Sequence, residues 1–151
     1  MYSDFSQGPS HLPDPERQSA FYEGVTIKRG LAWAIDFVVV AAMLVPAVLF
    51  TAFIGLFFLP FLFAVIGFVY RVLTIAGGSA TWGMRIMAIE FRDAFGRRLT
   101  FNQAFLHTLG YTVSLAVFPL QLVSVLCMFM TERGQGLTDM VLGTVALNRR
   151  A

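Results

Sequence analysis

An uninterrupted stretch without a charged side chain, from Phe37 to Tyr70, constrains the fold of this chain most. As a single helix, these 34 residues would be about 50 Å long, whereas the hydrocarbon core of a bilayer is about 30 Å thick. The stretch must therefore fold back on itself, near residues 51–55. Split evenly, it gives about 17 residues per arm, which is the lower limit for a membrane span. We therefore predict two longer membrane helices, over about residues 30–52 and 55–75.

The composition also places the chain among membrane proteins. Hydrophobic residues make up 57% of it and charged residues 13%, with a mean hydropathy of +0.71, whereas a soluble domain carries about a quarter charged residues. The basic residues flank the hydrophobic segments, so we expect a lipid bilayer, and no nucleic acid, as their partner. The single cysteine, Cys127, excludes an internal disulfide and a cysteine-based zinc site. We find no metal-ligand spacing and no nucleophile elbow, so we expect neither an enzyme nor a cofactor.

The basic residues also orient the helices. Lys28 and Arg29 precede the first helix, and Arg71 and Arg85 follow the uncharged stretch. By the positive-inside rule, both open ends of this hairpin, and with them the N-terminus, are expected in the cytoplasm. The first 26 residues lack the basic start and apolar core of a signal peptide, so we expect the first internal span to direct membrane insertion.

The two ends of the chain differ from its middle in composition and charge. Residues 1–23 contain three prolines, and their four acidic residues and one arginine give a charge of −3, although the whole chain carries +2. Such a segment buries too little apolar surface to offset the entropy of ordering it, so we expect a disordered acidic tail. We assign residues 24–148 to one membrane domain and residues 149–151 to a short basic end.

A second hydrophobic region covers residues 101–131. Thr100 followed by Gln103 is typical of a capping box that begins a helix, and Pro119 interrupts the region near its middle. Two arrangements fit this pattern. In one, the region is a single tilted third span; in the other, Pro119 marks the tip of a second, shorter hairpin.

We favour the second hairpin, with helices over about residues 101–118 and 119–131. The arginines that follow it obey the positive-inside rule only in that arrangement: Arg133, Arg149 and Arg150. Segments Ile86–Phe91 and Gly143–Asn148 have the pattern of short strands, and a lone strand would leave its backbone groups unpaired. The predicted fold is therefore an all-α membrane protein, with a transmembrane helical hairpin, a second Pro-broken hydrophobic hairpin and a small cytoplasmic β-element.

One carboxylate, Asp36, lies inside the apolar part of the first helix, about two turns from its start. A charge at that depth is costly against lipid, so it should face protein and have a partner. Arg29, seven residues earlier, lies on nearly the same helix face but about 10 Å away, and Asp139 is able to approach either residue. The cluster either binds or relays a cation or proton, or forms a structural ion network that closes the cytoplasmic end.

Three further polar residues are candidates for a relay or for structural contacts. His107 lies on the third helix among apolar residues, where a histidine serves either as a proton relay or, more commonly, as a hydrogen-bonded contact between helices. Arg85 belongs to a basic cluster that fits acidic lipid headgroups, or merely sets the topology. Thr81 stands four residues before Arg85, in the segment TWGMR.

The order of these features resembles the RDD family of bacterial membrane proteins, named for one arginine and two aspartates. The resemblance covers residues 24–148 and rests on three segments: IKRGLAWAIDF, TWGMR and ERGQGLTDMVLGTVAL. It implies that Arg29, Asp36 and Asp139 are the three family residues, and that the protein resides in the inner membrane. The sequence departs from the family at Met84, where many relatives have lysine, at Thr138, where histidine is frequent, and at His107, where arginine is frequent. Most members of the family have no assigned function, and some are linked to sodium/proton exchange.

Two functions are consistent with these features. The small size and the unbroken apolar surface favour an accessory or assembly protein that packs laterally against another membrane protein or a second copy of itself. The alternative is an oligomeric cation/proton transporter that uses Arg29, Asp36 and Asp139, because two short hairpins are too little protein to enclose a path alone. If Arg29 and Asp36 are coupled, Asp36→Leu alone should destabilise the fold more than replacing both residues.

Overall fold

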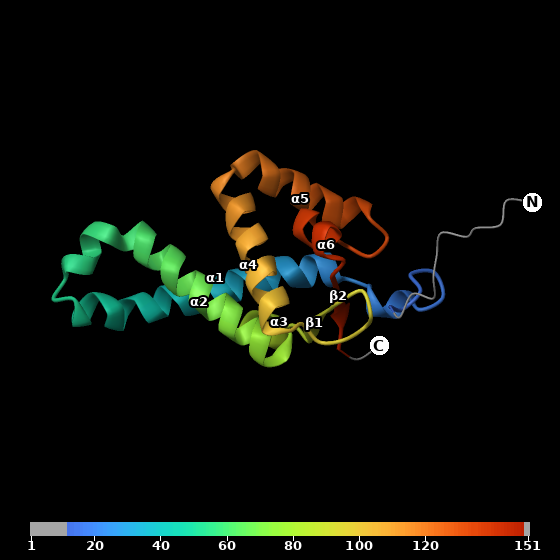
Figure 1. Cartoon of the computed structure of the whole chain (residues 1–151), viewed down its shortest axis with the longest axis horizontal. Helices are drawn as coiled ribbons and strands as arrows, with labels where there is room; N and C mark the ends of the chain where they lie inside the picture. The colour runs from blue at the N-terminus through green and yellow to red at the C-terminus, as the bar shows by residue number, and fades with distance from the viewer. Residues whose placement is uncertain (1–11, 150–151) are drawn as a thin grey trace, which may run out of the picture.

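The computed structural model describes residues 12–149, and these are mostly helical. Helices α1 (Val25–Phe50) and α2 (Leu59–Gly78) lie side by side and extend as a long arm from the rest of the molecule (Figure 1). With the short helical turns next to them, two continuous helical segments, Ser19–Phe50 and Ile54–Gly78, are long and apolar enough to cross a membrane. Few of their residues are buried inside the protein, so the chain is a membrane protein whose helices leave their sides to the lipid.

The first helix is longer at its N-terminal end than the sequence predicted. It begins after Gly24, whose φ of +67° ends the preceding turn, and it accommodates Pro46 in its interior. The turn that follows passes through Ala52 and Phe53, both with positive φ, into a 3-10 helix, Ile54–Phe58 (η2). The α-helical part of the second segment therefore begins at Leu59, after a 3-10 turn that covers the predicted start near residue 55.

The second hydrophobic region forms α4 (Phe101–Ala116) and α5 (Phe118–Met130). Thr100 and Gln103 make the capping box that the sequence predicted, with the Thr100 hydroxyl accepting from the Gln103 N–H and the Gln103 side chain accepting from the Thr100 N–H. The chain bends by 117° between the two helices, and Pro119 is the second residue of α5. As one broken element, the pair is also apolar and long enough to be a third span.

Two short helices and two strands lie at the end of α1 and α2 that is far from their connecting turn (Figure 1). Helix α3 (Trp82–Ile86) leads into β1 (Ile89–Arg92), and α6 (Leu137–Leu142) leads into β2 (Val145–Asn148). The strands pair antiparallel, with Ile89 opposite Asn148. The predicted pairing of two short strands is confirmed, although Ile86 belongs to α3.

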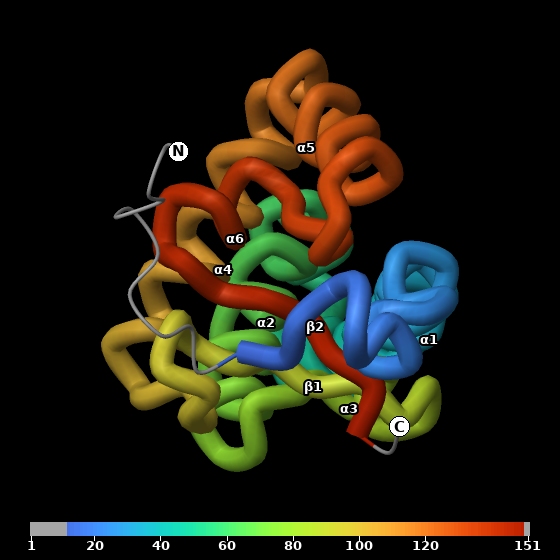
Figure 2. Tube along the Cα trace, turned by 90° about the vertical axis from the view of Figure 1, so that its right-hand side faces the viewer, coloured from blue at the N-terminus to red at the C-terminus, as the bar shows by residue number. Residues whose placement is uncertain are grey.

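The packed core of the protein lies at this same end, seen along the helix axes in Figure 2. Its buried apolar residues come from α1, α2, β1, α4 and β2: Val25, Ala32, Ile75, Phe91, Ala104 and Ala146.

The segment before α1 also packs against this end of the molecule. Asn148 donates two hydrogen bonds of 2.9 Å, to the carbonyls of Ala20 and Glu23. Residues 12–23, which we expected to be disordered, are therefore ordered in turns and a short 3-10 helix (Ser19–Phe21, η1); residues 1–11 and 150–151 lie outside the described part.

Candidate functional site

The carboxylate of Asp139, on the first turn of α6, is fully buried and accepts four hydrogen bonds. Its Oδ2 lies 2.5 Å from Nη1 of Arg29 and accepts from the Gly136 N–H at 3.1 Å. Its Oδ1 lies 2.8 Å from Nε2 of His107 and also accepts from the Thr144 hydroxyl at 2.8 Å. This single side chain therefore joins α1, α4, α6 and the start of β2.

The charge of Asp139 is stabilised by this environment. Burial alone would raise its pKa, but the Arg29 guanidinium and the hydrogen bond from His107 outweigh burial and hold the pKa well below its usual range. An ionised Asp139 accepts hydrogen bonds only, so Nε2 of His107 carries a proton, and in the neutral imidazole Nδ1 is then an acceptor. Arg29 also donates to the Gly134 carbonyl at 3.2 Å, and its guanidinium lies 5.4 Å from the centre of the Phe91 ring.

Asp36 has different partners, and Arg29 is not one of them. Its Oδ1 accepts from the Tyr70 hydroxyl at 2.6 Å and from the Gly83 N–H at 2.8 Å, and its Oδ2 accepts from the Thr81 hydroxyl at 2.5 Å. All three donors are neutral, and they come from α2 and α3. The expected coupling between Arg29 and Asp36 is therefore wrong: Asp36 holds α3 against α1 and α2, and the arginine pairs with Asp139.

The same contact explains the glycine of the TWGMR segment. A Cβ atom on Gly83 would lie 2.2 Å from the carbonyl oxygen of Ala32 and 2.8 Å from the Asp36 carboxylate. Only glycine allows α3 to lie this close to α1. Thr81 begins α3, with its side-chain oxygen accepting from the Met84 N–H at 3.2 Å while its hydroxyl proton goes to Asp36.

Arg85 lies away from these two carboxylates. Its guanidinium donates to the carbonyls of Thr74 and Ala80, at 3.2 and 3.3 Å, which lie at and just beyond the C-terminal end of α2. A cation is favourable near the C-terminal end of a helix. In this structure Arg85 thus ties the end of α2 to the segment that follows it.

Arg71 is a further candidate residue, which the sequence associated only with topology. It lies within α2, and its guanidinium is 4.1 Å from the centre of the Tyr111 ring of α4. The Tyr111 hydroxyl in turn accepts from the Trp33 indole N–H at 2.6 Å. The available signal was an arginine placed one turn before the predicted end of a membrane helix, where a charge needs a protein environment.

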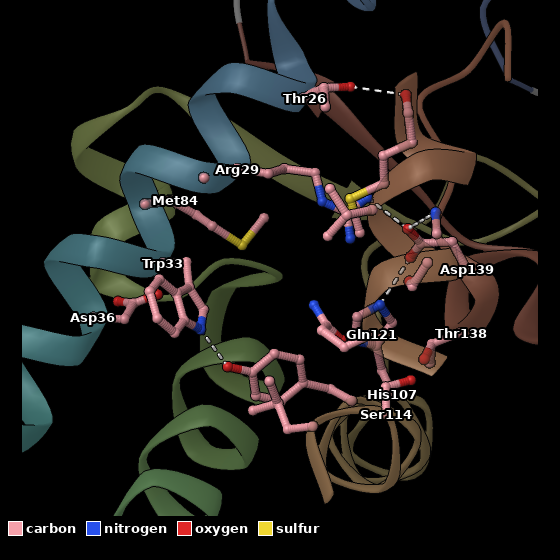
Figure 3. A pocket seen from close by; sticks show the side chains of 18 of the residues that line it. Thr26, Arg29, Trp33, Asp36, Met84, His107, Ser114, Gln121, Thr138 and Asp139 are labelled. Atoms are coloured by element: carbon pink, nitrogen blue, oxygen red, sulfur yellow. Dashed lines mark hydrogen bonds and ion pairs between the residues drawn. The ribbon is translucent and has the colours of Figure 1, made fainter. Parts of the chain in front are cut away.

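A cavity of about 590 Å³ lies between α1, α2, α4, α5 and α6. Arg29, Asp36 and Asp139 all line it, together with Arg71 and His107, and Figure 3 shows the charged side chains on its wall. The three residues therefore converge on one space without forming one ion cluster. Within residues 12–149, no group of three His, Cys, Asp or Glu side chains is placed to hold a metal ion.

Comparisons with known proteins agree with the resemblance seen in the sequence. No curated protein and no solved structure matches the chain. A model of the RDD family matches residues 24–143, which is most of the chain and includes the arginine and both aspartates of the cavity. The chain belongs to the RDD family, a family of membrane-associated proteins of unknown function.

Proposed function

We propose that this RDD-family protein is an accessory or assembly component of the bacterial inner membrane, which acts by packing against another membrane protein. The observation that carries the proposal is that each aspartate is already held by several hydrogen bonds within the protein. Asp139 binds four donors and Asp36 binds three. A relay residue has to exchange its proton or ligand, and each exchange here would break hydrogen bonds that hold helices together.

The arm formed by α1 and α2 offers a surface for such packing. On α1, one exposed stripe has the spacing of a single helix face: Val38, Ala42, Val45 and Leu49. Membrane helices associate by close packing, which a small residue such as Ala42 permits. We call these four residues the outer face of α1, and propose that a helix of the partner protein lies along it.

The strand pairing supports a topology with both ends of the domain in the cytoplasm. The hydrogen bonds between β1 and β2 support a placement of the segments before α4 and after α6 on the same side of the membrane. Lys28, at the start of α1, donates to Asn148 of β2 at 2.7 Å, so the N-terminal end of α1 lies there too. We therefore propose that α4 and α5 form a re-entrant hairpin, and that the third-span arrangement does not occur.

Site-specific photocrosslinking in the membrane tests the accessory role. A photoreactive amino acid is placed at Val38, Val45 or Leu49, and at the buried Val40 of the same helix as a matched control. We expect the outer-face positions to capture one and the same membrane protein, and Val40 to capture none. If the outer face captures only lipid or a second copy of the chain, the accessory role is wrong.

Cation/proton exchange by an oligomer is the second candidate, because Arg29, Asp36 and Asp139 line one cavity. The test is ion flux into proteoliposomes that contain the purified protein. Exchange through this cavity requires a flux that Asp36→Asn abolishes. An unchanged flux in that variant would exclude the mechanism.

A further inference from the structure

One buried arginine on the cavity wall has no ion-pair partner within residues 12–149. Asp139 is paired with Arg29, and Asp36 accepts hydrogen bonds from three neutral donors. The guanidinium of Arg71 lies over the Tyr111 ring, its Nε is buried without a hydrogen-bond partner, and it takes part in none of the ion pairs in the described part of the chain. A desolvated cation without an acceptor is unfavourable, so this position fits a bound anion.

A second unpartnered group lies on the same wall. His107 is buried, 2% exposed, and lines the cavity, but its Nδ1 has no hydrogen-bond partner. Because Nε2 donates to Asp139, Nδ1 is left as an acceptor. The polar part of the cavity thus offers a cation for an acidic group and an acceptor for a hydroxyl group.

The mouth of the cavity is apolar. Its large apolar lining residues with exposed side chains come from α1, α4 and α5: Ile27, Leu31, Trp33, Leu115, Phe118, Val125 and Phe129. Figure 3 shows the polar side chains of the wall. Since α1 belongs to a segment that is long and apolar enough to cross a membrane, this apolar mouth is suited to acyl chains.

We propose that the cavity binds an anionic lipid of the surrounding bilayer, with its phosphate at Arg71 and an acyl chain leaving between α1 and α5. An arginine binds a phosphate through paired, charge-assisted hydrogen bonds. A glycerol headgroup adds a hydroxyl group that donates a hydrogen bond to Nδ1 of His107. The volume of about 590 Å³ lies within the range of about 300–1,000 Å³ that is usual for ligand pockets. This site does not depend on the accessory role proposed above.

Native mass spectrometry of the full-length protein in a neutral detergent tests this proposal. The probes are phosphatidylglycerol, phosphatidylcholine with the same acyl chains, and inorganic phosphate. We expect phosphatidylglycerol to bind at least about tenfold more tightly than phosphatidylcholine, and inorganic phosphate not to compete, since it lacks the chain. Equal binding of the two lipids, or competition by inorganic phosphate at the concentration of the lipid, would overturn the proposal.

Two variants locate the site. Arg71→Gln should weaken phosphatidylglycerol binding about tenfold, and Arg71→Lys should restore only part of it, because lysine keeps the charge but not the paired hydrogen bonds. Gly30 lines the cavity, and a Cβ there would meet nothing within 4 Å, so Gly30→Leu begins in open space and is expected to obstruct the cavity. Gly77→Leu is the matched control, because Gly77 is equally open and helical but lies outside the cavity lining. If Gly30→Leu and Gly77→Leu bind the lipid equally well, the lipid lies elsewhere; this outcome is readable even if Arg71→Gln does not fold.

Discussion

The ion pair between Arg29 and Asp139 should make the largest single electrostatic contribution to the stability of the domain. Its Nη1 and Oδ2 atoms are 2.5 Å apart, and the two side chains are 12% and 0% exposed. Removing one member of such a pair leaves the other charge buried, which costs about 3–5 kcal/mol. Asp139→Asn should fall in this range, because it also weakens the bonds from Thr144 and His107.

A double-mutant cycle separates the pair from these neighbours. Arg29→Leu and Asp139→Asn together should cost less than the sum of the two single changes, by a coupling free energy of about 2 kcal/mol. Arg29→Leu with Asp36→Asn is the matched control. These side chains share no partner, and their positions are about 10 Å apart along α1, so the two effects should add to within about 0.5 kcal/mol.

The assay is unfolding of the purified protein in mixed micelles, followed by circular dichroism as the fraction of denaturing detergent rises. The reasoning is refuted if the Arg29/Asp139 coupling is below about 0.5 kcal/mol, since a buried ion pair has to couple. It is refuted equally if Arg29 and Asp36 couple as strongly as Arg29 and Asp139. That second result would mean that the hydrogen bonds from Tyr70, Thr81 and Gly83 are not what holds Asp36.

Three further predictions follow from the same contacts. Gly83→Ala should cost about 1–3 kcal/mol of unfolding free energy in the same assay, because its Cβ meets the Ala32 carbonyl at 2.2 Å, whereas Gly77→Ala, in open space, should be neutral or slightly stabilising. Folding lowers the pKa of Asp139, so the ionised side chain stabilises the folded protein at pH values above its ordinary pKa of 3.8, and this stabilisation is lost as the pH falls below 3.8. Unfolding measured over a pH series should show the loss, and the Asp139→Asn variant should show a smaller dependence of stability on pH. Reporter domains fused after residue 96 and after the C-terminus should both be cytoplasmic, and an external reporter at the C-terminus would contradict the re-entrant arrangement of α4 and α5.

The sequence predicted the features that depend on length and local pattern. The charge-free stretch from Phe37 to Tyr70 is too long for one span, and this is enough to predict two membrane helices. The capping box at Thr100 and the pairing of two short strands rest on equally local rules. The sequence left open whether Asp139 approaches Arg29 or Asp36. Helix spacing shows which side chains share a face of one helix, but it does not show which other segment packs against that face.

The partners of Asp36 were beyond this reasoning for a specific reason. They lie 34, 45 and 47 residues further along the chain, at Tyr70, Thr81 and Gly83. Two of these donors are side-chain hydroxyl groups and the third is a backbone N–H. None of them is charged, so the sequence gives no reason to pair them with a buried carboxylate. Arg71 was assigned to topology because the positive-inside rule counts arginines at helix ends and does not ask what surrounds them.

The two aspartates are not equivalent, and their difference explains why a cavity persists at this place. Asp139 fixes α1, α4 and α6 through charge-assisted bonds, while Asp36 fixes α1, α2 and α3 through neutral donors. Together they hold α1 at a set distance from both α2 and α4, so the space between them cannot close by a shift of α1 without breaking buried hydrogen bonds. An apolar gap in a protein is normally costly and closes where its walls are able to relax. A polar frame around a partly apolar cavity, with Arg71 on its wall outside any ion pair of the described residues, therefore supports the lipid site that we propose, and in that site the family residues hold the walls apart.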